Sequence, residues 1–125
     1  MIADTTFISD LLKERRRGEF GRAGAFFAAN RKRQIRTSII TAGEVALMFE
    51  DSESCWRWLE PWTIYRLHRG IVDAAAEIDR EQIRKGRRLG ENDNWIAGFA
   101  RYYREPLISR DGNFDGITGV RRADY

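Results

Sequence analysis

The chain opens with MIADTTFISDLL (residues 1–12), in which a short apolar strand is followed at once by a helix. The strand ends at Asp4, and the apolar residues between Phe7 and Leu12 recur at helical spacing. Three consecutive arginines and then Gly18 mark the end of this helix. A strand that leads directly into a helix is the repeating unit of α/β folds.

The same alternation continues along the rest of the chain. Further strands are predicted at residues 35–40, 62–67, 107–109 and 120–125. Further helices are predicted at 21–32, from Thr41 onward, and at 55–59, 72–83 and 93–104. Because no two strands are joined by a two-residue hairpin, we expect them to be parallel, with helices on both faces of the sheet. The prediction is an α/β fold, a three-layer α/β/α sandwich around a central, mainly parallel sheet of four to five strands.

Length and composition predict one folded domain over residues 1–125. Of the 125 residues, 42% are hydrophobic and 33% are charged, which is enough apolar surface for one core. A single cysteine, Cys55, and a single histidine, His68, exclude an internal disulfide and a Cys/His zinc site. No uncharged stretch near the N-terminus approaches the about 20 residues of a membrane span. Asp4 and Asp10 lie where a secretion signal needs positive charge, so we expect a cytoplasmic protein without a membrane contact.

Arginine dominates the charge of the chain. The net charge of +3 arises from 22 basic and 19 acidic residues, and the only lysines are Lys13, Lys32 and Lys85. Basic residues cluster at 15–17, 31–33 and 84–88. Guanidinium groups bind phosphate and stack on bases, so the clusters favour an anionic partner. Cations at helix ends also stabilise helices, so a purely structural explanation remains open.

Four acidic residues fall where predicted strands end or helices begin: Asp4, Glu44, Asp93 and Asp111. Each also has a structural explanation as a helix cap or turn residue, and Glu44 completes a possible capping box with Thr41. In a parallel α/β sheet these positions share the carboxyl edge, where ligands bind. Carboxylates at one edge repel one another unless a cation holds them. Oxygen ligands without His or Cys suit Mg²⁺ or Mn²⁺, which support phosphodiester hydrolysis.

Four segments resemble, in order and spacing, the motifs of PIN-domain nucleases: Ile2–Thr6, Ile40–Glu44, Leu89–Ala97 and Ile108–Phe114. The third segment, LGENDNWIA, is the most specific of them. The resemblance extends over nearly the whole chain and is greatest to the VapC-type toxins of bacterial toxin–antitoxin pairs, whose compact PIN domain has about this length. It implies a three-layer α/β/α fold and a Mg²⁺- or Mn²⁺-dependent endoribonuclease.

The resemblance also implies roles for the site residues. Asp4, Glu44 and Asp93 would hold the metal ion, directly or through water, and Asp111 would complete or orient the set. Thr6 would be a small hydroxyl beside the pocket that orients a carboxylate or a water. One of the acids, or the ion, would help to deprotonate the attacking water, which leaves 3′-hydroxyl and 5′-phosphate ends.

A fifth acid, Asp115, leaves open which of Asp111 and Asp115 faces the ion, although the position just after a strand favours Asp111. The run that ends at Gly116 also matches the first half of an EF-hand calcium loop. That loop needs a glutamate at its twelfth position, where this chain has Arg122. His68 is the only candidate base for a Ser or Cys triad, which makes nucleophilic catalysis a poor alternative.

A toxin of this class is expected to have two protein partners besides its RNA substrate. A cognate antitoxin would cover the acidic cleft, with a basic side chain among the carboxylates. A second copy of the chain would form a homodimer through apolar residues around Phe49, Trp56 and Trp58. The alternative function is a non-catalytic PIN-like module that binds RNA or a protein. That alternative gains if Glu44 or Asp93 is used up in helix capping.

Overall fold

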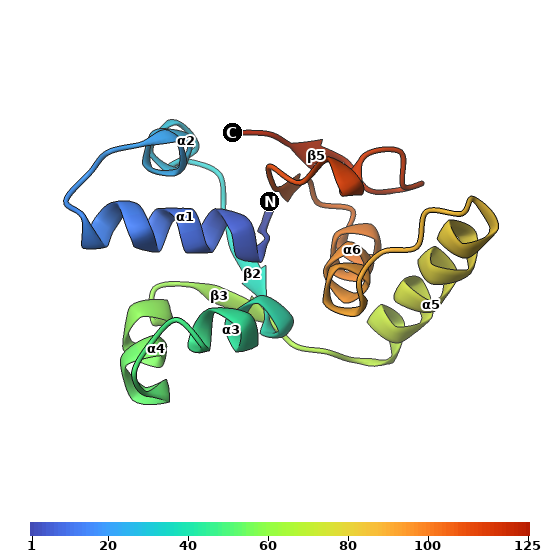
Figure 1. The fold of residues 1–125 in the computed structure, drawn as a ribbon, viewed down its shortest axis with the longest axis horizontal. Helices are drawn as coiled ribbons and strands as arrows, with labels where there is room; N and C mark the ends of the chain where they lie inside the picture. Colours follow the sequence, from blue (N-terminus) through green and yellow to red (C-terminus); the bar gives the residue numbers. More distant parts are fainter.

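The computed structural model describes residues 1–125 and contains a five-stranded sheet between two groups of helices (Figure 1). The strands are β1 (Ile2–Ala3), β2 (Arg36–Ser38), β3 (Thr63–Tyr65), β4 (Leu107–Ile108) and β5 (Arg122–Ala123). Their order across the sheet is β3-β2-β1-β4-β5, and every neighbouring pair is parallel. The predicted α/β fold with a parallel sheet is therefore confirmed.

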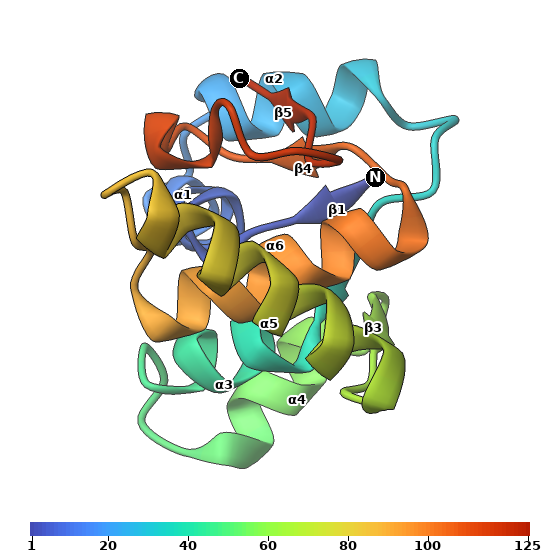
Figure 2. The ribbon, with the colours of Figure 1, turned by 90° about the vertical axis from the view of Figure 1, so that its right-hand side faces the viewer.

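Helices lie on both faces of this sheet. They are α1 (Thr5–Arg16), α2 (Arg22–Ala29), α3 (Ile39–Ala46), α4 (Ser52–Leu59), α5 (Arg69–Arg84), α6 (Glu91–Tyr103) and the short 3-10 helix η1 (Gly112–Phe114). Figures 1 and 2 show α5 and α6 packed side by side, and Figure 1 shows α1 and α2 on the other side of the strands. None of the helices is long and apolar enough to span a membrane.

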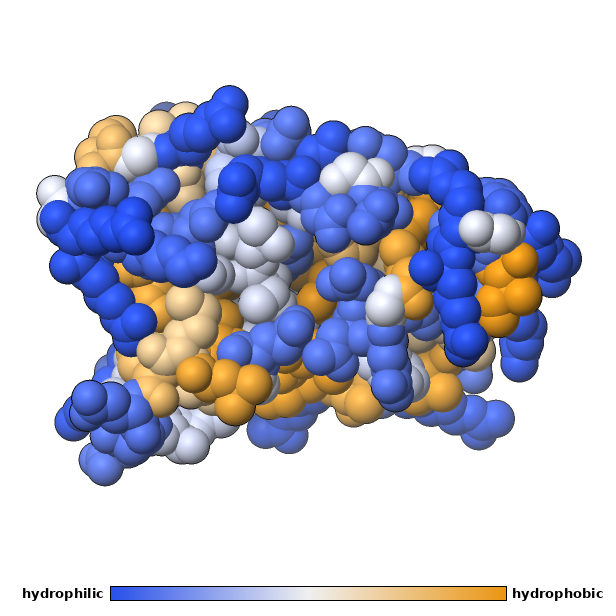
Figure 3. Space-filling view, viewed as in Figure 1, coloured by the Kyte–Doolittle hydropathy of each residue, from blue (hydrophilic) through white to orange (hydrophobic).

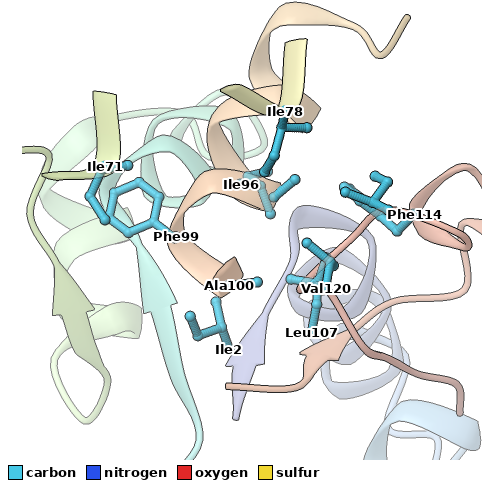
Figure 4. Packing of buried hydrophobic residues seen from close by; sticks show 11 residues of the cluster. Ile2, Ile71, Ile78, Ile96, Phe99, Ala100, Leu107, Phe114 and Val120 are labelled. Carbon is cyan, nitrogen blue, oxygen red and sulfur yellow. The ribbon is translucent and has the colours of Figure 1, made fainter. Parts of the chain in front are cut away.

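Neighbouring residues of the short strands enter two different cores. Ile2 and Leu107 point toward α5 and α6, whereas Ala3 and Ile108 point toward α1 to α4. Figure 4 shows the first core, in which Ile2 and Leu107 lie among apolar side chains of α5, α6 and the C-terminal segment. Burial on both faces is typical of parallel sheets and explains why the strands contain so few exposed residues.

The boundary between β2 and α3 differs from the prediction. The predicted strand at 35–40 ends at Ser38, and the helix predicted from Thr41 begins at Ile39. Ser38 causes both differences, because its Oγ accepts the N–H of Thr41 at 3.1 Å and so caps α3. The β-branched Ile39 and Ile40 favour a strand locally, but the cap starts the helix before them.

Other helix ends also differ from the prediction. α2 ends at Ala29, three residues before its predicted end at residue 32, and its last turn contains no basic residue. α4 begins at Ser52 because the carboxylate of Asp51 caps it. α6 begins at Glu91, so Asp93 lies in the first turn of this helix rather than at its start.

Candidate active site

The four predicted acids lie at the carboxyl edge of the sheet. Asp4 follows β1 directly, and Asp111 follows the end of β4. Glu44 lies in α3, which follows β2, and Asp93 lies in the first turn of α6. Because the strands are parallel, the segments that follow β1, β2 and β4 meet at the same edge. The fold therefore brings together acids from four separate segments of the chain.

Asp4 is almost completely buried, with 3% of its surface exposed. Its Oδ1 accepts the N–H of Phe7 at 2.8 Å and thereby caps α1. Burial is the main cause that raises the pKa of Asp4 from 3.8 to about 6. The carboxylates of Asp93 and Asp111 add to this shift, and hydrogen bonding to Ser109 opposes it. Asp4 is thus a fixed carboxylate whose charge is poorly compensated within the protein.

Glu44 is held by a hydroxyl of another helix. Oγ1 of Thr5 donates to Oε1 of Glu44 at 2.6 Å. The structural alternative, a capping box of Thr41 with Glu44, does not form, because the oxygen that caps α3 belongs to Ser38. The prediction assigned the auxiliary hydroxyl to Thr6, whose side chain is half-buried and forms no hydrogen bond. The residue that sequence reasoning missed is Thr5, and its position directly after Asp4, at the first turn of α1, is the signal that marks it.

Asp93 is half-buried and its carboxylate forms no hydrogen bond or ion pair with the protein. It does not cap α6, whose N-cap residue is Gly90. The pKa of Asp93 is raised, chiefly by burial and then by the carboxylates of Asp111 and Glu44. Asp93 is therefore a carboxylate without a protein partner, and the negative charges of Asp111 and Glu44 act on it.

Asp111 and Asp115 differ in their partners. Oδ1 of Asp111 accepts the N–H of Asn113 at 2.9 Å, and the same carboxylate raises the pKa values of Asp4 and Asp93. Asp115 instead accepts two hydrogen bonds from Arg122, at 2.8 and 3.0 Å, which lower the pKa of Asp115. The structure thus places Asp111 beside the other acids and pairs Asp115 with an arginine.

The donor set can be tested against a divalent metal ion. None of the four acids, Asp4, Glu44, Asp93 and Asp111, forms an ion pair within the protein. As the side chains stand, no three His, Cys, Asp or Glu side chains are grouped so that they could hold one ion. Mg²⁺, however, keeps several waters and is commonly bound through only one or two carboxylates. The uncompensated oxygens at this edge fit a hydrated ion of that kind.

Comparison with known proteins identifies the family. Residues 1–120 match the family model of the PIN domain, and the chain belongs to this family. No curated protein matches the chain. The match to the PIN domain model confirms the resemblance that the sequence motifs indicated.

Several solved structures share the fold. The chain is similar to VapBC2 from Rickettsia felis bound to a promoter DNA fragment, with 16% identity, a TM-score of 0.82, and 99% of this chain and 97% of that chain covered. It is similar to VapBC-1 from nontypeable Haemophilus influenzae, with 24% identity, a TM-score of 0.78 and coverage of 98% and 96%. For a toxin–antitoxin complex from Klebsiella pneumoniae the identity is 26%, the TM-score 0.71 and the coverage 95% and 93%.

Proposed function

We propose that the protein is a Mg²⁺- or Mn²⁺-dependent endoribonuclease and the toxin of a type II toxin–antitoxin pair. The observation that carries the proposal is the group of four carboxylates, Asp4, Glu44, Asp93 and Asp111, which share one sheet edge and form no ion pair within the chain. Membership of the PIN domain family supports a nuclease, and the likeness to toxin–antitoxin complexes supports the toxin role. An RNA substrate would be met in the cytoplasm, and we propose that the protein acts there.

In the proposed reaction a water attacks the phosphorus atom while the bond from phosphorus to the 3′-oxygen breaks. The leaving 3′-oxygen takes up a proton from solvent, which gives 5′-phosphate and 3′-hydroxyl ends. Asp4, Glu44 and Asp93 would hold the metal ion, directly or through its waters, and Asp111 would complete or orient the set. A bound divalent ion neutralises charge on the phosphate and lowers the pKa of water. Asp93, whose oxygens accept no hydrogen bond within the protein, is also the carboxylate free to accept the proton of the attacking water.

The alternative of a non-catalytic binding module is less well supported. It requires that capping uses up Glu44 or Asp93. Glu44 instead accepts a hydrogen bond from Thr5, and Gly90 is the N-cap residue of the helix that contains Asp93. Both carboxylates are therefore available for chemistry, which supports the enzyme over the module.

Two protein partners form part of the proposal. An antitoxin that inserts a basic side chain among the four carboxylates would supply the missing positive charge and exclude the metal ion. A homodimer would use exposed apolar residues such as Leu47, 88% exposed, and Trp56, 50% exposed. Phe49 and Trp58, also predicted for this interface, are half-buried and pack against each other. Figure 3 shows a largely hydrophilic face with smaller apolar patches. The dimer is tested by sedimentation of the purified chain.

Cleavage of a mixed RNA pool in Mg²⁺, in Mn²⁺ and in EDTA tests the enzyme. We expect metal-dependent cleavage that Asp93→Asn lowers by at least about 100-fold, because the substitution removes the proton acceptor. Asp115→Asn is the matched control, since it makes the same change at an acid that Arg122 already pairs, and it should retain cleavage. Equal cleavage by both variants, or undiminished cleavage in EDTA, would overturn the proposal.

A further inference from the structure

A polar pocket lies beside Asp93. Its volume is about 230 Å³, and it is lined by Arg87, Arg88, Leu89, Gly90, Asp93 and Asn113. We call it the arginine pocket. It connects the loop between α5 and α6 with η1, the segment that follows Asp111. A side chain of the proposed active site therefore forms one wall of a pocket that also contains two arginines.

The two arginines of the pocket differ in their partners. Arg88 forms two hydrogen bonds with the carboxylate of Asp79, at 3.0 and 3.3 Å. The Arg87 guanidinium forms no ion pair or hydrogen bond. One of its terminal nitrogens lies above Gly116, 3.6 Å from the place where a Cβ atom of that residue would be. Arg87 thus has no ion-pair partner, although its charge helps to lower the pKa of Asp115 in the segment that follows Asp111.

The backbone of Arg87 is held in place by a buried glutamine. The backbone N–H of Arg87 donates to the backbone carbonyl oxygen of Gln82 at 2.9 Å. The side-chain Nε2 of Gln82 donates to the backbone carbonyl oxygen of Arg87 at 3.2 Å. Gln82 is 2% exposed, and its Oε1 has no partner. An unpaired buried oxygen costs stability, so a polar residue at this position needs a reason. The clamp on the Arg87 backbone provides one.

We propose that the arginine pocket is a phosphate subsite, in which the Arg87 guanidinium and the Asn113 side-chain amide bind a backbone phosphate of the RNA next to the cleaved one. This inference rests on the proposed nuclease function. A guanidinium binds phosphate through two parallel hydrogen bonds, and an amide NH₂ is a neutral donor for a third oxygen. The acidic group repels a polyanion, and a guanidinium beside Asp93 would offset this repulsion and help to hold the strand in register. The Asn113 side chain, like that of Arg87, has no partner within the protein.

The test uses the full chain and a short single-stranded RNA of mixed sequence. Cleavage rates are measured for Arg87→Gln in Mg²⁺ over a series of salt concentrations. We expect kcat/KM to fall about tenfold or more, mainly through KM, because a charge-assisted phosphate contact is lost. The dependence of log KM on log salt should become shallower by about 0.7, the value for one phosphate contact with a single strand.

Arg80→Gln is the matched control, since Arg80 is exposed, lies in α5 outside the basic clusters and lines no part of the pocket. It changes the net charge equally and should change kcat/KM less than about twofold. Asn113→Ala is the second variant, and it should lower kcat/KM about threefold with an unchanged salt slope, because its contact is uncharged. Thermal melts confirm that each variant is folded.

The outcomes separate the subsite from the nuclease. If the wild type cleaves RNA and Arg87→Gln matches Arg80→Gln in kcat/KM and salt slope, the subsite is wrong and the nuclease stands. If the wild type cleaves no RNA with either metal ion, the proposed function fails and the subsite fails with it.

Discussion

The acids at the amino and carboxyl edges of the sheet differ in whether the chain supplies them with an ion-pair partner. At the amino edge, Glu105 forms an ion pair with Arg36 and accepts a hydrogen bond from the Tyr65 hydroxyl at 3.2 Å. The ammonium group of Met1 lies 3.9 Å from the same carboxylate. This edge therefore compensates the charge of its acid with groups of the chain itself.

At the carboxyl edge, Asp4, Glu44 and Asp111 accept hydrogen bonds from uncharged donors, Asp93 accepts none, and none of the four forms an ion pair. An acid that is compensated within the chain stabilises the fold, whereas uncompensated acids cost stability until an external cation arrives. The difference teaches that the acids of the two edges serve different purposes, although both lie beside the same strands. Only the carboxyl edge is arranged for a ligand.

The strongest test of this difference between the edges is to neutralise one acid at each edge and compare the stability of the two variants. Glu105→Gln should lower the free energy of unfolding by about 1 to 2 kcal/mol, because Arg36 and the N-terminus lose a partner. Asp4→Asn should raise it by about 2 to 3 kcal/mol at pH 7, because the buried charge is removed and asparagine still caps α1. Urea unfolding in EDTA measures both. Effects of the same sign would contradict the comparison.

The second prediction concerns pH. The pKa of Asp4 is about 6 in the folded chain and ordinarily 3.8, so the folded chain binds this proton more tightly than the unfolded chain does. The contribution of Asp4 to stability is therefore most favourable below pH 4 and falls by about 3 kcal/mol as the pH rises to 6. The advantage of Asp4→Asn over the wild type should appear over this pH range and be absent at pH 3.5. An advantage that is constant with pH would contradict the assignment.

Much of the fold and the acidic set could be predicted from the sequence, because both follow from local patterns. Apolar runs such as Leu107–Ser109 alternate with amphipathic segments, and acids such as Asp4 follow them at once. The start of α3 could not be predicted as readily, since Ile39 and Ile40 have strand propensity and only the Ser38 cap decides the boundary.

Contacts between distant segments were beyond prediction. The hydrogen bond from Thr5 to Glu44 joins α1 to α3, and no spacing rule connects residues on separate helices. The same applies to the neighbours Arg87 and Arg88, which look alike in sequence. Only the packed structure shows that Asp79 binds one of them and leaves the other free.

The smallest expected effect compares hydroxyls that donate to an acid at each edge. Thr5→Val keeps the shape of the side chain but removes the donor that orients Glu44, so kcat/KM for RNA should fall about tenfold while stability changes by less than about 1 kcal/mol. Thr6→Val, which removes a hydroxyl without a hydrogen bond, should change neither. Tyr65→Phe removes the donor to Glu105 and should lower stability by about 1 kcal/mol without changing cleavage. If Thr6→Val impaired cleavage more than Thr5→Val, the hydroxyl that serves the carboxyl edge would be that of Thr6. The hydrogen bond from Thr5 to Glu44 would then no longer support the distinction between an edge built for stability and an edge built for a ligand.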